Sequence, residues 1–206
     1  MSWEGASSSS CGLPVPIVEL FRDSIYSEPV LMLAIAEHKV PFDGRGGDSQ
    51  CDIWALISTK PGVFSLSVEA KANEPFGRDN EPLAEWLVAG KSEKSLENRQ
   101  RRWDDIKVHL PGAEKDGYSE VAYQLLHRCA AAVKEARRFC LNHAAFFIQS
   151  FKSPEKSFTE YARFCSAIGI KAERGRMQIT AVGDVRLGIG WADCPLATDE
   201  QVATVV

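Results

Sequence analysis

The chain has 206 residues, 45% of them hydrophobic and 25% charged, which is the composition of a single globular domain with a sizeable core. Its 28 acidic and 24 basic residues give a net charge of -4, which excludes a strongly basic nucleic-acid coat but allows a local basic groove. No apolar run approaches the ~20 residues of a membrane span, and the six cysteines show neither a CxxC pair nor zinc spacing. These features predict a cytoplasmic protein with no membrane partner.

The N-terminal part predicts a tail followed by a helix. Residues 1–16 are rich in Ser, Gly and Pro, so we expect a loose N-terminal tail and one domain over residues 17–206. The tail has no basic segment ahead of an apolar core, so a secretory signal is not expected. Residues 17–39 are predicted to be helical, and Glu37 shares the stripe of their apolar residues. The stripe consists of Val30, Leu33 and Ala34.

Residues 51–71 predict an antiparallel hairpin, because two strand-like segments flank a Lys60-Pro61-Gly62 turn. The second segment alternates, with Phe64, Leu66, Val68 and Ala70 on one face and Ser65, Ser67, Glu69 and Lys71 on the other. Glu69 and Lys71 are therefore expected on one face, roughly 6.6 Å apart along the strand. Asp52 begins the partner strand, so the hairpin can bring it beside Glu69.

The rest of the chain predicts a mixed α/β domain. Residues 75–95 are expected to be irregular or to form a short helix. An apolar strand over residues 144–151 contains no turn residue, so it is expected in the middle of the sheet. Ser157 is the expected N-cap of the last helix, and Gly169 its end. Helices are expected over 95–110, 119–140 and 157–169, and a closing strand pair over 177–183 and 185–192.

Asp52, Glu69 and Lys71 together suit the metal-assisted hydrolysis of a phosphodiester. Carboxylate oxygens are the ligands that Mg²⁺ or Mn²⁺ prefers. A metal there would lower the pKa of a bound water, and a lysine could orient that water and balance developing charge. We expect Lys71 to be partly exposed in a cleft for this role.

The same pattern, Asp52 and then Glu69-Ala70-Lys71 on the next strand, resembles the PD-(D/E)xK nuclease superfamily. The resemblance implies a restriction-endonuclease-like fold, a mixed β-sheet flanked by helices in a single domain. It also implies that Asp52 and Glu69 bind the metal and that Lys71 assists the attacking water.

Further residues extend the resemblance over about residues 20–170. In many members a glutamate on the first core helix completes the metal site, and Glu37 matches that place. Gln124 is a weaker match for a glutamine that some exonuclease-like members carry on a later helix. Cys51 stands where the superfamily name has proline. Several blocks, including GGDSQCDIW and VEAKANEPFG, look like those of a bacterial family placed in this superfamily, with no activity to transfer.

The expected function is therefore that of a Mg²⁺-dependent nuclease acting on DNA, with a homodimer left open. One alternative is a non-catalytic domain on the same scaffold that binds nucleic acid or a protein. Another is an unrelated α/β protein in which Glu69 and Lys71 form a structural ion pair.

Two other motifs have ordinary interpretations. GRGGDS, at residues 44–49, lacks the Gly-Lys-Ser/Thr ending of a P-loop, so a plain turn is favoured over a phosphate-binding nest. The arginines of the helix near residue 100 could follow a phosphate backbone, but a solvated face paired with nearby acids is slightly favoured. These arginines are Arg99, Arg101 and Arg102, and the acids are Glu97, Asp104 and Asp105.

Overall fold

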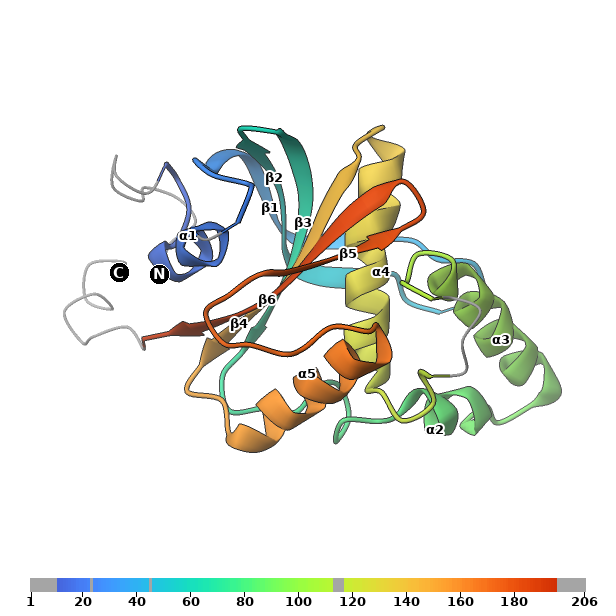
Figure 1. The fold of residues 1–206 in the computed structure, drawn as a ribbon. Helices are drawn as coiled ribbons and strands as arrows, with labels where there is room; N and C mark the ends of the chain where they lie inside the picture. The colour runs from blue at the N-terminus through green and yellow to red at the C-terminus, as the bar shows by residue number, and fades with distance from the viewer. Residues whose placement is uncertain (1–10, 23, 45, 113–116, 196–206) are drawn as a thin grey trace, which may run out of the picture.

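One six-stranded mixed sheet organises the chain, with helices on both of its faces (Figure 1). The computed structural model describes residues 11–22, 24–44, 46–112 and 117–195. The strands are β1 (Val30–Val40), β2 (Ser49–Thr59), β3 (Gly62–Lys71), β4 (His143–Phe151), β5 (Gln178–Val182) and β6 (Val185–Cys194). The helices are α1 (Val15–Phe21), α2 (Leu83–Val88), α3 (Glu93–Lys107), α4 (Tyr123–Arg138) and α5 (Glu155–Ala167). The α/β class and the mixed, helix-flanked sheet are as expected from the sequence.

The strands follow the order β1-β2-β3-β4-β6-β5 across the sheet. The first three form an antiparallel meander, and its second turn joins Thr59 to Gly62 as the predicted hairpin. β4 runs parallel to both β3 and β6, so the apolar segment is central, as predicted. β5 and β6 form the predicted antiparallel pair.

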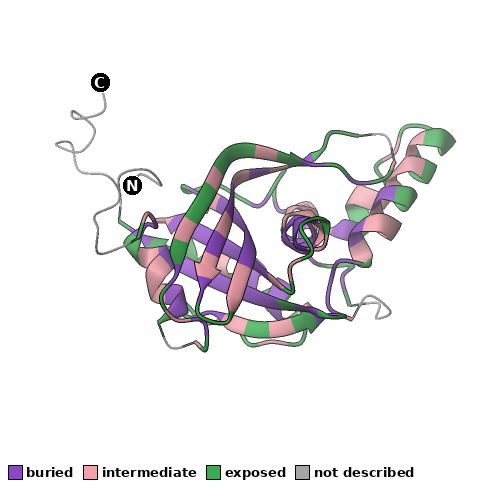
Figure 2. Cartoon of the chain, turned by 90° about the horizontal axis from the view of Figure 1, so that it is seen from above, coloured by how far each residue is buried: buried purple, intermediate pink, exposed green. Residues whose placement is uncertain are grey.

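The two faces of the sheet carry separate cores. On one face α1 packs Leu20 and Phe21 against the apolar side of β3, which includes Phe64 and Leu66. On the other face α4 lies along the middle strands, and α5 packs beside it. α3 packs against α4 and, with α2, lies farther from the sheet (Figure 1). Seen from above, burial is concentrated in the central strands and α4 (Figure 2).

The predicted helix over residues 17–39 is wrong in its second half. Only Val15–Phe21 is helical, and Val30–Val40 is the edge strand β1. A helical stripe of apolar residues can also arise in an edge strand that is half exposed, and β1 gains its backbone hydrogen bonds from β2. Glu37 therefore does not lie on a helix.

Smaller differences occur at element ends. α5 begins at Glu155, with Pro154 rather than Ser157 before its first turn, because a proline suits the position that needs no amide donor. Gly169 ends this helix as predicted, in a left-handed conformation with φ of 80°. Most of the predicted tail lies outside the described residues, although Leu13 is buried and α1 begins at Val15. Of the helices described, none has the length and apolar character needed to cross a membrane.

Candidate functional site

The β2–β3 hairpin carries Asp52, Glu69 and Lys71, as predicted. Glu69 and Lys71 project from the polar face of β3 toward α4, and the alternate residues Leu66 and Val68 pack on the α1 side. Both charged side chains are buried, at 2% and 4% exposure. The expectation of a partly exposed Lys71 is thus wrong, because α4 covers this face of β3.

Glu69 is enclosed by hydrogen-bond donors. Its Oε1 accepts from Gln124 Nε2 at 2.7 Å and lies 2.9 Å from Lys71 Nζ, and its Oε2 accepts from Arg128 Nε at 2.7 Å. Gln124 and Arg128 are one turn apart on α4, so the same helix face supplies both. A carboxylate has about four lone-pair positions. Three are taken by these contacts, and one on Oε2 is left.

Asp52 lies within electrostatic reach of this group. Its Oδ2 accepts a hydrogen bond from the backbone amide of Ala70 at 2.7 Å. The pairing of β2 with β3 ends at Ile53 and Val68. Beyond that point the Asp52 carboxylate, rather than a main-chain carbonyl, accepts the hydrogen bond of the Ala70 amide. Burial and the negative charge of Glu69 raise the pKa of Asp52. The two carboxylates therefore repel each other at this end of the hairpin.

Glu37 lies across the β1–β2 ladder from Asp52, since Ala36 pairs with Ile53 and His38 with Cys51, but its side chain has a different partner. It lies on β1 with φ of 56°, is exposed, and accepts a hydrogen bond from the Gln50 side chain. Among the residues that the structure describes, no three His, Cys, Asp or Glu side chains are grouped closely enough for a metal ion. The structure brings Asp52 and Glu69 to the same end of the hairpin. Glu37 faces Asp52 from β1, but its exposed side chain, on a residue with φ of 56°, bonds Gln50 rather than joining them.

A chain of polar contacts runs from Glu69 through Arg128 and Ser49 to His127. Arg128 Nη1 donates to Ser49 Oγ at 3.3 Å, and Ser49 Oγ lies 2.8 Å from His127 Nδ1. Burial, with the positive charges of Arg128 and Arg102, holds the pKa of His127 well below its usual range. His127 is therefore neutral at physiological pH. Burial also raises the pKa of Cys51 to about 11, so this thiol is not a nucleophile.

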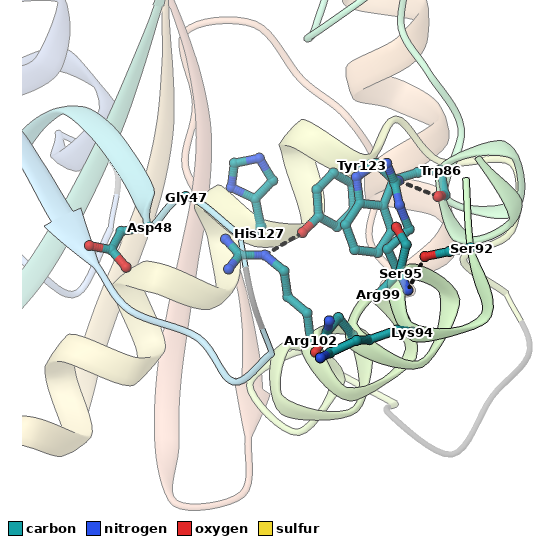
Figure 3. Close-up of a pocket in the computed structure, with 12 residues that line it drawn as sticks. Gly47, Asp48, Trp86, Ser92, Lys94, Ser95, Arg99, Arg102, Tyr123 and His127 are labelled. Atoms are coloured by element: carbon teal, nitrogen blue, oxygen red, sulfur yellow. Dashed lines mark hydrogen bonds between the residues drawn. The ribbon is translucent and has the colours of Figure 1, made fainter. Parts of the chain in front are cut away.

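His127 lies in the wall of a pocket of about 600 Å³ between the β1–β2 loop, α3 and α4 (Figure 3). This pocket was not predictable from the sequence, since its walls come from segments far apart in the chain. Its arginines were expected on a solvated helix face, but Arg102 is buried and its Nε donates to Tyr123 Oη at 2.8 Å. The lining residues are Gly46, Gly47, Asp48, Trp86, Ser92, Lys94, Ser95, Asn98, Arg99, Arg102, Tyr123 and His127.

Comparison with known proteins places the chain in a family. Residues 1–195 match the family model described as a domain of unknown function, DUF6946, and the chain belongs to that family. No curated protein and no solved structure matches it.

Proposed function

We propose that the protein is a metal-dependent nuclease that hydrolyses DNA phosphodiester bonds on a restriction-endonuclease-like fold. The observation that carries the proposal is the meeting of Asp52, Glu69 and Lys71 with Gln124 where β2, β3 and α4 come together. Two carboxylates, a lysine and a helical glutamine are the residue types that the resemblance implies for such a site.

The arrangement of the elements supports the same fold type. The chain runs from α1 through β1 to the β2–β3 hairpin, then through α2 and α3 to α4 and β4, and β4 joins β3 in parallel. The charged residues lie on the hairpin beside this central parallel pair.

Asp52 and Glu69 have a donor set that fits a divalent cation. Mg²⁺ commonly uses one or two carboxylates and keeps several waters. Glu69 has one lone-pair position left on Oε2. The raised pKa of Asp52 reflects its burial and then the repulsion from Glu69, and a cation would relieve both. A Mg²⁺ or Mn²⁺ ion held there would polarise a phosphoryl oxygen and lower the pKa of a bound water.

The remaining residues would orient the substrate and balance its charge. Lys71 Nζ is held 2.9 Å from Glu69 and 5.5 Å from the centre of the Phe76 ring, so its position is defined before substrate arrives. Lys71 is proposed to orient the attacking water, and its charge stabilises the extra negative charge of the transition state. Arg128, fixed by Glu69 and Ser49, adds a second positive charge from α4.

Cleavage of plasmid and single-stranded DNA with Mg²⁺ or Mn²⁺ tests the proposal. We expect wild-type protein to cut at least one of them, and Asp52→Asn and Lys71→Met each to lower the rate by about a hundredfold or more. Glu37→Gln is the matched control, because it also changes a carboxylate but lies outside the cluster, and it should retain activity. Wild-type protein that cuts neither substrate would refute the enzyme.

A non-catalytic domain that binds nucleic acid is the second candidate. The observation that favours it is the enclosure of Glu69 by two cationic side chains, Lys71 and Arg128, which neutralises the carboxylate within the fold. Binding of DNA without cleavage, unaffected by Asp52→Asn, is the result expected from this candidate.

A further inference from the structure

The pocket beside α3 has a positive lining that the candidate nuclease site does not use. Lys94, Arg99 and Arg102 line it, against a single carboxylate from Asp48. Across the described part of the chain, none of these three cations forms a salt bridge. Three cations without carboxylate partners in one concave site favour an anionic ligand.

Arg102 gives the most direct indication of that ligand. Arg102 is only 6% exposed, yet its Nη1 has no hydrogen-bond partner among the described residues. Its Nε is held by Tyr123 Oη at 2.8 Å, and its guanidinium lies 5.7 Å from the centre of the Phe42 ring. A buried charged donor without a partner is costly, and such groups commonly serve a bound ligand. The fixed guanidinium is therefore ready to donate to an anion.

The glycine-rich loop leaves room for the anion. A Cβ at Gly46 would lie 3.8 Å from Arg102 Nη1, and a Cβ at Gly47 would meet nothing within 4 Å. A side chain at Gly46 would therefore contact the arginine. Gly46 thus lets the loop backbone lie close to Nη1 with no side chain between them, a role that the expected plain turn did not include.

The opposite wall is rigid and partly aromatic (Figure 3). The rings of Trp86 and Tyr123 stack with centroids 3.8 Å apart, and the Arg99 guanidinium covers Trp86 at 4.7 Å. The N-terminus of α3, capped by Ser92, adds its positive dipole end to the same pocket. Trp86 is thus held between Tyr123 and Arg99, which fixes the Arg99 guanidinium at the pocket wall.

We propose that this pocket binds a phosphate group of a nucleic-acid strand, with Arg102, Arg99 and Lys94 as its cationic contacts. The contacts from Arg128 through Ser49 to His127 connect the pocket with Glu69 along α4. Phosphate binding in the pocket depends only on the residues that line it, so it can be tested independently of the proposed hydrolysis.

Binding without hydrolysis tests the pocket. Fluorescence anisotropy would follow a 3′-labelled single-stranded oligonucleotide with a 5′-phosphate, and the same strand with a 5′-hydroxyl, in EDTA and phosphate-free buffer. Inorganic phosphate is the competitor, with chloride at equal ionic strength as its control. Arg99→Gln and Arg102→Gln should each weaken binding about tenfold, the effect of losing one charge-assisted contact. Arg101→Gln is the matched control, because Arg101 is exposed on the same helix and does not line the pocket.

The outcomes separate the sources of the phosphate. Tighter binding of the 5′-phosphorylated strand assigns the pocket to a terminal phosphate, and equal binding that inorganic phosphate displaces assigns it to an internal one. Arg102→Lys, which keeps the charge, and a thermal melt of each variant identify any loss of folding. Unchanged affinity in folded Arg99→Gln and Arg102→Gln, or no competition by phosphate beyond that of chloride, would overturn the proposal. Cleavage by wild-type protein with no effect of these variants on binding would overturn the pocket and leave the nuclease standing.

Discussion

Replacing Glu69 by glutamine tests how strongly the buried charge cluster depends on its carboxylate. In the native structure one side chain accepts from Lys71, Gln124 and Arg128. An amide has a single oxygen, so its NH₂ group must face either Arg128 Nε or the Lys71 and Gln124 donors. At least one charge-assisted hydrogen bond is lost, worth roughly 1.5–3 kcal/mol. The half-buried Arg128 loses its carboxylate partner, and the buried Lys71 keeps only Glu74, at 3.9 Å. Breaking a buried ion pair in this way costs about 3–5 kcal/mol, so we expect a loss in that range.

Urea unfolding at pH 7 measures this loss. Glu37→Gln makes the same chemical change on the exposed side of β1 and should alter the free energy of unfolding by no more than about 0.5 kcal/mol. The double variant Glu69→Gln with Lys71→Met should recover part of the loss, because it removes one of the stranded cations. A cost below about 1 kcal/mol for Glu69→Gln would refute the buried-cluster reasoning.

Three further predictions concern titration and metal binding. Because burial raises the pKa of Asp52, this group weakens the fold as pH rises from the unfolded value of about 3.9 through the raised folded value. In EDTA, the stability advantage of wild type over Asp52→Asn should therefore shrink between acidic and neutral pH, and urea melts that show it growing would contradict the assigned shift. Burial and the positive charge of Arg137 lower the pKa of His109 from 6.5 to about 4. The neutral imidazole therefore contributes stability that is fully present above pH 6.5, and this stability is lost as the pH falls toward 4. His109→Gln should remove up to about 3 kcal/mol of that pH dependence, and an unchanged profile would count against it. Millimolar Mn²⁺ should raise the melting temperature of wild type but not of Asp52→Asn, and calorimetry without heat of binding would exclude the metal site.

The hairpin and its charged face were predictable from local pattern. Alternation with period two assigns Glu69 and Lys71 to one face wherever the strand lies, and the Pro61-Gly62 turn sets the pairing with β2. What covers that face is not a local property. α4 approaches from residues more than fifty positions away, and its Gln124 and Arg128 turn an expected open cleft into a buried cluster.

The prediction of a helix up to residue 39 was wrong for a related reason. Residues 30–40 have apolar side chains at spacings that suit a helix as well as a strand, and nothing local distinguishes the two. Pairing with β2 resolved the ambiguity in favour of a strand, because that contact supplies the backbone hydrogen bonds. Glu37 moved with it, from the expected core side of a helix to an exposed position on the edge strand.

Composition and short-range periodicity were sufficient for the α/β class, the central strand and the pair of charged residues on β3. These features depend on neighbours along the chain, whose spacing the sequence states directly. The burial of Lys71, the bonding of Glu37 to Gln50 rather than to the Asp52 site and the pocket around Arg102 required the tertiary structure. Each of them arises from segments distant in the chain, and side-chain environment depends on which of those segments pack together.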